Sequence, residues 1–371
     1  MQKYLHPSAF PLESGETLPQ LEIGYYTYGQ LNESQNNVVW ICHALTGNAD
    51  AADWWAGLVG KGKLFDPAEH FIICANMLGS CYGTTGPNSI DPETGKPYGK
   101  AFPLITIRDM ISAHQVLQKH LGIERIKLAI GGSMGGQQVL EWAVADPHLF
   151  ERICVLATNA KHSPWGIAFN EAQRMAIEAD PTIYDDHSEA GKMGLEAARA
   201  VAMLSYRNYN IFHHTQSDTT PDKIQDFRAS SYQRYQGNKL HRRFNVLSYL
   251  TLSKAMDSHN VGRNRGELEK AMRRIQAKTL VIGIQSDLLF PVEEQIIIAN
   301  FVPNAQLEII ESPYGHDGFL VESEKITGLI QPFLNQWSYN NSSGKYRLRP
   351  QPGAGKSRGG ERSALPGTES F

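Results

Sequence analysis

Short runs of apolar residues recur along the chain and alternate with segments whose apolar residues have helical spacing. Such runs occupy Val38–Cys42, Phe71–Ala75, Ile126–Ile130, Ile153–Ala157, Leu280–Ile284 and Leu307–Ile310. Near-continuous apolarity over so few residues is typical of parallel strands covered by helices on both faces. Helical spacing spans Ile107–Leu121, and a second helical pattern runs from about Met134 to Ala145 and ends before Pro147. The chain is therefore predicted to have an α/β fold with a mostly parallel sheet flanked by helices.

Two segments depart from this alternation. The tyrosine-rich segment LEIGYYTYG (21–29) alternates with a period of two, which predicts an antiparallel edge strand. Between about Lys161 and Lys278 no parallel-strand run occurs, and GLEAARAVAMLSYRNYN (194–210) predicts an amphipathic helix. A helical insertion between two late strands is expected to form a lid over an active site. The alternative is a second helical domain without a role in the site.

These patterns predict the domain organisation. Residues 1–160 form the first part of the core, 161–278 the helical lid, and 279–337 the second part of the core. The final segment, 338–371, is rich in Gly, Pro, Ser and Arg and cannot bury enough apolar surface to offset the entropy of ordering, so we expect it to be disordered.

Composition narrows the class of protein. With 371 residues, 41% of them hydrophobic, the chain can bury a full core without disulfides or metals. A net charge of −3 gives no reason to expect nucleic acid or an anionic membrane surface as a partner. The four cysteines show no C-x-x-C spacing, and we interpret the three within strand-like runs as buried thiols rather than a metal site or a disulfide. Without an apolar targeting segment or a long apolar run, we expect a soluble, cytoplasmic protein.

Residues 131–142, GGSMGGQQVLEW, place a serine between two pairs of glycines. Gly131–Gly135 matches G-x-S-x-G directly after a predicted strand and directly before a predicted helix, which is the arrangement of the nucleophile elbow. We expect the glycines to permit a strained turn that presents Ser133 as a nucleophile. The alternative is a glycine-rich turn whose serine only caps the helix.

A serine nucleophile needs a base and a carboxylate that orients it. In α/β-hydrolase enzymes the chain order is Ser, then Asp or Glu, then His, each after a late strand. Asp287 follows the run Leu280–Ile284, and His316 follows the run Leu307–Ile310 in a glycine-flanked loop. Asp287 and His316 are therefore the predicted partners of Ser133.

The same fold predicts two backbone donors for an oxyanion. One is the N–H of Met134, directly after the nucleophile, and the other is the N–H of about Leu45, in the loop after Val38–Cys42, where Gly47 permits a turn. His43 precedes the serine in the chain, and we interpret it as a structural histidine.

Several long motifs together carry a resemblance to a known family. They are HALTGNAD, NMLGSCYGTTGPNSIDPETGKPYGKAFPLITIRDM, GGSMGGQQVLEWA, ARAVAMLSYR, SHNVGRNRG, GIQSDLLFP and YGHDGFL, in this order. From about Gly24 to Trp337 the chain closely resembles the homoserine O-acyltransferases of methionine biosynthesis, which have the α/β-hydrolase fold.

The resemblance implies roles for further residues. Asp317 is similar to the family's ligand for the homoserine amino group, Arg199 to its carboxylate partner, and Tyr206 to a tyrosine that lines the same pocket. An amino-acid zwitterion needs one cation and one anion, which agrees with this pair. Arg207, Arg263 and Arg265 are weaker candidates for contacts with the phosphates of coenzyme A. The chain departs from the family pattern at Tyr82, where many relatives carry a basic or other polar residue.

The expected function is transfer of an acetyl group from acetyl-CoA, as a co-substrate, to the hydroxyl of L-homoserine by a ping-pong mechanism. No permanently bound cofactor and no metal are expected, and the resemblance implies a homodimer formed through the lid. Tyr82 leaves donor preference open, so a succinyl-CoA donor is one alternative. An L-serine acceptor in place of homoserine is another. A plain esterase and a catalytically silent binding protein of the same fold are the other two.

Overall fold

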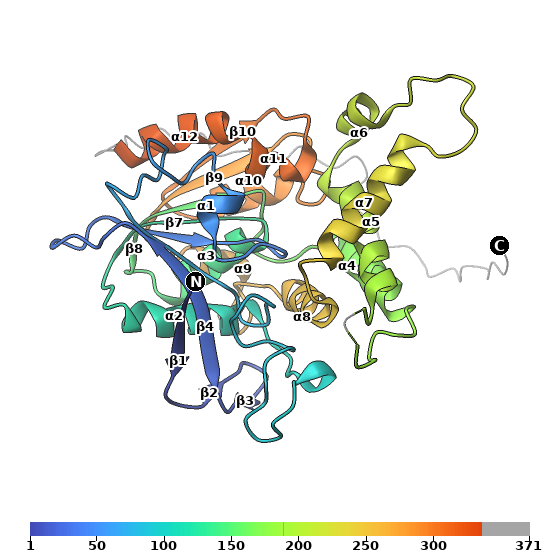
Figure 1. The fold of residues 1–371 in the computed structure, drawn as a ribbon. Helices are drawn as coiled ribbons and strands as arrows, with labels where there is room; N and C mark the ends of the chain where they lie inside the picture. Colours follow the sequence, from blue (N-terminus) through green and yellow to red (C-terminus); the bar gives the residue numbers. More distant parts are fainter. Residues whose placement is uncertain (188, 336–371) are drawn as a thin grey trace, which may run out of the picture.

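A sheet of eight strands forms the centre of the protein in the computed structural model, which describes residues 1–187 and 189–335. The strands are β1 (Gln2–His6), β4 (Leu21–Tyr28), β5 (Val38–Cys42), β6 (Phe71–Ala75), β7 (Ile126–Gly132), β8 (Phe150–Leu156), β9 (Lys278–Ile284) and β10 (Ala305–Ile310). Their order in space is β1-β4-β6-β5-β7-β8-β9-β10 (Figure 1). All neighbouring pairs from β6 to β10 are parallel, whereas β4 is antiparallel to β1 and to β6. A separate small ribbon pairs β2 (Phe10–Pro11) with β3 (Thr17–Leu18).

The predicted parallel strands are confirmed, but the prediction that residues 21–29 form the edge of the sheet is wrong. Strands β5 and β6 have the predicted bounds, β7 continues to Gly132, and β8 begins earlier and ends earlier than predicted. Strand β4 is antiparallel as predicted, but β1 covers it and forms the edge. Strand β1 has no buried residue, so its sequence carries no apolar pattern that could reveal it.

Two layers of helices cover the sheet, and the strand residues alternate between them. Within β5, Val38 and Trp40 belong to the core cluster on one face, and Val39 and Ile41 to the cluster on the other. Helices α2 (Ile107–His120), α3 (Met134–Ala145) and α10 (Val292–Phe301) contribute to the first cluster. The second face is covered by the segment around α1 (Ala51–Trp54), by α11 (Gly318–Val321) and by α12 (Ser323–Asn335). Strand β5 is completely buried on both faces, which explains its continuous apolar run.

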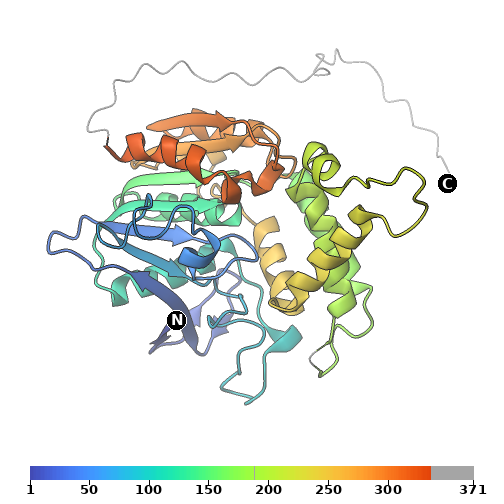
Figure 2. The same cartoon turned by 45° about the horizontal axis from the view of Figure 1, so that its top comes forward.

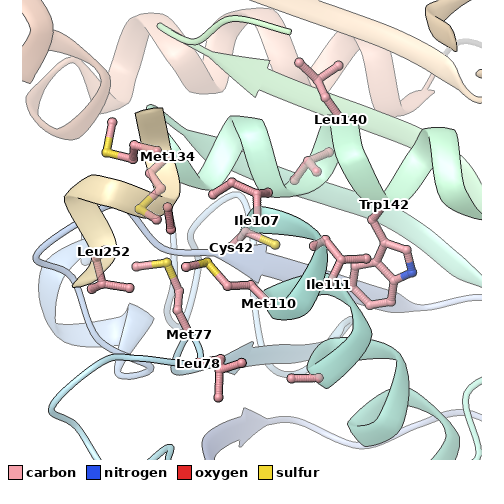
Figure 3. Close-up of a cluster of buried hydrophobic side chains, with 14 of the residues drawn as sticks. Cys42, Met77, Leu78, Ile107, Met110, Ile111, Met134, Leu140, Trp142 and Leu252 are labelled. Atoms are coloured by element: carbon pink, nitrogen blue, oxygen red, sulfur yellow. The ribbon is translucent and has the colours of Figure 1, made fainter. Parts of the chain in front are cut away.

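The interval between β8 and β9 is helical. It contains α4 (Pro164–Glu178), α5 (Lys192–Tyr206), α6 (Tyr209–Gln216), α7 (Arg228–His241), α8 (Val246–Asp257) and α9 (Leu268–Met272). In both views α4 to α7 form a group beside the sheet, and α8 lies between this group and the sheet (Figures 1 and 2). Leu252 of α8 is fully buried in the main core cluster, near Met77 and Met110 (Figure 3). The helical insertion therefore shares its core with the sheet.

The helix predicted over 194–210 is interrupted. Helix α5 ends at Tyr206, Arg207 and Asn208 have extended backbones, and α6 begins at Tyr209. The Asn208 side chain accepts a hydrogen bond from the Ile211 N–H at 3.1 Å, so it caps α6. The periodic pattern continued across this break because both helices have apolar faces.

Three of the four cysteines are buried in strands, as predicted: Cys42, Cys74 and Cys154; all four are free thiols. The predicted tail, 338–371, lies outside the described residues. None of the helices in the described part of the chain has both the length and the apolarity that a membrane crossing requires.

The glycines of the 131–136 segment allow α3 to pack against the sheet without intervening side chains. A Cβ atom on Gly135 would collide with the backbone carbonyl of Cys42 in β5, and one on Gly131 would collide with the backbone of Gly135. Neither obstacle is a flexible side chain, so a larger residue must displace the helix or the strand.

We predict that Gly135→Ala lowers the free energy of unfolding by about 3 kcal/mol or more, since α3 must move away from β5. Urea denaturation followed by circular dichroism measures this change. The matched control is Gly328→Ala in α12, where the added methyl group meets no atom within 4 Å. That control should stabilise the protein by about 0.5–1 kcal/mol, because alanine restricts the unfolded chain more than glycine. Equal effects at the two positions would contradict the packing argument.

Candidate active site

Ser133 occupies a sharp turn between β7 and α3. Its φ is +56° and its ψ is −127°, an unfavourable conformation for a residue with a Cβ atom. None of the four neighbouring glycines has a positive φ, so the strain lies on the serine, and the glycines supply space instead. The serine side chain makes no capping hydrogen bond to α3, which contradicts the alternative that it only caps the helix.

The backbone around Ser133 is held from several sides. Its N–H donates to the Leu156 carbonyl at 2.9 Å, and its own carbonyl accepts from the Thr158 hydroxyl at 2.7 Å. The next side chain, Met134, is fully buried in the main core cluster (Figure 3). Anchors of this kind are required to maintain a strained turn.

Asp287 and His316 meet at the carboxyl ends of β9 and β10. Asp287 Oδ2 lies 2.7 Å from His316 Nδ1, and Asp287 Oδ1 accepts from the N–H groups of Leu289 at 2.8 Å and Phe290 at 2.9 Å. Both side chains are almost completely buried. With its Nδ1–H donated to the carboxylate, the imidazole has Nε2 available as a base.

Aromatic rings enclose the His316 imidazole. Phe290 stacks on it at 5.1 Å between centroids, and Phe319 and Tyr206 lie at 5.3 Å and 5.7 Å. Phe319 also packs against Gly132, the residue before Ser133. One ring thus contacts both the histidine and the serine turn, which places these two groups in the same site.

The two predicted oxyanion donors belong to the first turn of α3 and to the turn after β5. Met134 is the first residue of α3, where the N–H has no acceptor within the helix. Leu45 lies in a turn that is closed by the Gly47 N–H donating to the Ala44 carbonyl at 2.8 Å.

His43, just before this turn, is fully buried, and burial lowers the pKa of its imidazole to about 4. Its ring nitrogens contact the Ala44 carbonyl and the Met77 N–H. It remains neutral at physiological pH and is structural, as predicted.

Helix α5 brings Arg199, in its middle, close to Tyr206, its last residue. The Arg199 guanidinium lies 5.1 Å from the centre of the Tyr206 ring, and that ring faces His316. Arg199 Nε and Nη1 are buried, and within residues 1–187 and 189–335 no hydrogen-bond acceptor contacts them. Buried guanidinium groups are normally paired, so Arg199 is prepared to receive an anionic group.

Asp317 follows His316 and lies in the same environment. Burial raises the pKa of its carboxyl, and the positive charges of Arg207 and Arg199 offset this rise only in part. Arg207 Nε is 2.7 Å from Asp317 Oδ2. The site thus holds one unpaired cation and one partly compensated carboxylate beside the serine, histidine and aspartate.

Comparisons with known proteins identify the family. A family model described as alpha/beta hydrolase fold matches residues 37–323. A homoserine O-acetyltransferase of Cyclobacterium marinum is 52% identical over 88% of this chain and 92% of its own length, and that of Chlorobium chlorochromatii is 47% identical over 90% and 95%. The chain belongs to the homoserine O-acetyltransferase family. It is therefore an acyltransferase with the α/β-hydrolase fold, which confirms the predicted fold and family.

Solved structures agree with this assignment at the level of the fold. The crystal structure of homoserine O-acetyltransferase from Bacillus anthracis has a TM-score of 0.84 at 26% identity and covers 90% of this chain and 97% of its own. The structure of esterase E22 has a TM-score of 0.82 at 26% identity, with coverage of 90% and 99%. The backbone alone does not separate transferases from esterases, so the distinction must lie in side chains.

The structure corrects the interpretation of three arginines in this family member. Arg263 Nη2 pairs with Glu13 Oε2 at 2.6 Å, and Arg265 Nη2 pairs with Glu141 Oε1 at 2.6 Å. These two arginines join loop 260–266 to the N-terminal segment and to α3, so they are structural. Arg207 pairs with Asp317 rather than standing free for a phosphate.

Two further residues of the site region were not found from the sequence. Arg243, between α7 and α8, donates to the Thr46 carbonyl at 2.6 Å and to the Tyr82 hydroxyl at 3.1 Å, so it joins the lid to the Leu45 turn. Glu294 accepts a hydrogen bond from Asn159 at 3.0 Å, and burial raises the pKa of its carboxyl to about 7. Neither residue belongs to a motif with a known spacing, and only the tertiary fold gives them these neighbours.

Potential metal ligands do not gather anywhere in the described part of the chain: no three His, Cys, Asp or Glu side chains lie close enough to hold an ion.

Proposed function

We propose that this protein transfers an acetyl group from acetyl-CoA to the hydroxyl of L-homoserine through an acyl-enzyme on Ser133, as part of cytoplasmic methionine biosynthesis. Acetyl-CoA acts as a co-substrate, and no permanently bound cofactor takes part. The two relatives named homoserine O-acetyltransferase, which are 52% and 47% identical to this chain, support the reaction.

In the first half-reaction, His316 Nε2 removes the Ser133 hydroxyl proton as the serine oxygen attacks the thioester carbonyl. The N–H groups of Met134 and Leu45 stabilise the resulting oxyanion. The carbon–sulfur bond then breaks, coenzyme A leaves as a thiol with the proton from His316, and the acetyl group remains on Ser133. Asp287 holds the imidazole in the tautomer that this sequence requires.

In the second half-reaction, the homoserine hydroxyl gives its proton to His316 and attacks the acyl-enzyme carbonyl. The same two N–H groups stabilise the second oxyanion. When it collapses, the serine oxygen leaves and regains the proton from His316. If water attacked the acyl-enzyme instead, the same cycle would be hydrolysis, so transfer requires that the acceptor outcompetes water. Ser133 and His316 are only 5% and 3% exposed, and this burial restricts the access of water to the acyl group.

The observation that carries the choice of acceptor is the guanidinium of Arg199, whose Nε and Nη1 are buried without a hydrogen-bond partner in the described part of the chain. The Tyr206 ring lies 5.1 Å from this guanidinium and 5.7 Å from the His316 ring, so a carboxylate on Arg199 leaves the rest of a small molecule near the base. Asp317 supplies the opposite charge for an ammonium group. An amino acid with a side-chain hydroxyl supplies a carboxylate for Arg199, an ammonium group for Asp317 and a hydroxyl for the base. A neutral alcohol or water would use neither the cation nor the anion of the site.

We predict that acetyl-CoA without an acceptor adds one acetyl group to Ser133, observed as an increase in intact mass and located by peptide mapping. L-Homoserine should remove the label and yield O-acetylhomoserine. Ser133→Ala should acquire no label. Labelling by succinyl-CoA instead would favour the alternative donor, discharge by L-serine the alternative acceptor, and rapid discharge by water alone an esterase. Absence of any label in the wild type would contradict the acyl-enzyme mechanism.

We predict that Arg199→Gln lowers kcat/KM for homoserine by about 10- to 100-fold, the effect of losing a charged hydrogen-bonded contact. The rate of acylation by acetyl-CoA should stay within about twofold of the wild type, since the acceptor takes no part in that step. Steady-state and single-turnover kinetics measure the two quantities. Arg234→Gln, an exposed arginine on α7, is the matched control. A loss of acylation rate in Arg199→Gln would contradict an acceptor-binding role.

We also propose that two chains associate through the helical lid. Large apolar side chains are exposed on its outer helices, among them Leu204 of α5, Tyr209 of α6 and Tyr235 of α7. Exposed apolar groups concentrated on neighbouring helices are typical of a protein interface. A second copy of the same chain is the partner that the family resemblance implies.

We predict that the protein sediments with the mass of two 41.3 kDa chains and that the double variant Leu204→Glu/Tyr235→Glu sediments as one. Two buried carboxylates per chain would oppose association. Leu5→Glu, a similarly exposed residue on β1, is the control and should leave the mass unchanged. A wild-type protein that sediments as a single chain at micromolar concentration would contradict the dimer.

A further inference from the structure

The C-terminal end of helix α5 packs directly against the loop that carries His316. Gly315, with φ of +63°, lies so close to α5 that a Cβ atom on it would be 3.1 Å from the Arg207 carbonyl carbon and 3.1 Å from the Tyr206 carbonyl oxygen. On the same loop, the Tyr314 ring lies 5.7 Å from the Arg207 guanidinium carbon. Arg207 is thus in contact with the residues before and after the proposed base.

The ion pair between Arg207 and Asp317 is partly sheltered and geometrically incomplete. The exposed fractions of the two side chains are 23% and 14%. Although Nε and Oδ2 are 2.7 Å apart, the Nε–H is not aligned with the carboxylate for a hydrogen bond. The pair therefore neutralises charge without occupying the lone pairs of Asp317 in a strong bond. These lone pairs remain available to a donor from another molecule.

Arg207 is the main group that opposes the effect of burial on the protonation of Asp317. Burial is the main influence on the carboxyl and raises its pKa, and Arg207 is the strongest of the groups that lower it. Arg199 on α5 and His316 on the loop act in the same direction, whereas Asp287 from the loop after β9 raises the pKa. Tyr206 also faces this carboxylate. Without Arg207, desolvation would favour the protonated acid, which cannot attract a cation.

We infer that Arg207 is a positioning residue for the acceptor: it keeps Asp317 ionised and oriented toward the ammonium group, and so makes the second half-reaction selective for acceptors with a free amino group. This inference rests on the proposed function, in which Asp317 receives that ammonium group. Arg199, in the middle of α5, and Arg207, directly after its C-terminal end, then have different tasks. Arg199 binds the acceptor carboxylate directly, whereas Arg207 acts only through Asp317.

Two acceptors separate this role from a general contribution to lid packing. L-Homoserine and 4-hydroxybutanoate share the hydroxyl and the carboxylate, but only homoserine has the amino group. In Arg207→Gln, kcat/KM for homoserine should fall by about tenfold or more, whereas kcat/KM for 4-hydroxybutanoate should change by less than about twofold. The rate of Ser133 acetylation by acetyl-CoA should be unchanged, which also shows that the variant is folded. Arg207→Lys, which keeps the positive charge, should recover part of the loss.

The pH profile provides a readout that a structural role would not change. Removing Arg207 leaves the effect of burial on Asp317 less opposed, so the pKa of that carboxyl rises. The acid limb of kcat/KM for homoserine should therefore move to higher pH in Arg207→Gln. The profile of the acetylation step should not move. The matched control is Lys192→Gln, at the beginning of the same helix, which removes an exposed ion pair with Glu189.

A double-mutant cycle completes the test. If Arg207 acts through Asp317, then Arg207→Gln in an Asp317→Asn background should cause little further loss with homoserine. Additive losses, equal losses with both acceptors, or an unshifted acid limb would overturn the inference. If wild-type acetyl-enzyme forms but homoserine fails to discharge it, the proposed function fails instead, so the two failures are distinguishable.

Discussion

The contact between helix α3 and strand β5 is the constraint on which the active site depends. At this contact the chain cannot accommodate a Cβ atom on Gly131 or Gly135, so the helix begins directly beside the sheet. The chain must therefore reverse its direction within one residue, and Ser133 takes the unfavourable positive φ. Such strain costs about 1–3 kcal/mol and persists only where the surroundings impose it. Burial of Met134 and the hydrogen bonds of the serine backbone to Leu156 and Thr158 supply that constraint.

The helical insertion between β8 and β9 is fixed against the sheet because the two share a core. Helix α8 buries Leu252 and Tyr249 completely. A buried polar network centred on His162 also joins α3 to α4 and α8. In that network Gln137, one turn into α3, donates to Asn159 at 2.9 Å, and Asn170 of α4 donates to Asp257 of α8 at 2.8 Å. Buried polar networks specify one arrangement, since any displacement leaves groups unsatisfied. The position of α5, and with it the position of Arg199, is consequently tied to the position of the nucleophile.

The similarity to both a transferase and an esterase shows how little of the chemistry lies in the backbone. TM-scores of 0.84 and 0.82 mean that the same framework surrounds both kinds of enzyme. The serine, histidine and aspartate, together with two backbone donors, can in principle serve transfer to water as well as transfer to an alcohol. In the function that we propose, a pair of opposite charges, Arg199 and Asp317, favours an amino-acid acceptor over water or a neutral alcohol.

The amino-acid sequence by itself determined the elements whose physical basis is local. Strands buried on both faces appear as continuous apolar runs, so β5 and β6 were predicted with their bounds, and the G-x-S-x-G turn indicated Ser133 in its place before α3. Chain order after the late strands indicated Asp287 and His316, which the structure brings within 2.7 Å of each other. Family motifs added Arg199 and Asp317, whose surroundings no local pattern describes.

Only the tertiary structure decided which distant groups became partners. Strand β1 has no buried face, so its pairing with β4 left no mark on the apolar pattern. Arg207, Arg263 and Arg265 look alike in the sequence, because a charged side chain carries no local signal of its partner. The fold pairs one with Asp317 in the site and the other two with Glu13 and Glu141 away from it. Periodicity reports burial, whereas charge pairing depends on which elements meet in space.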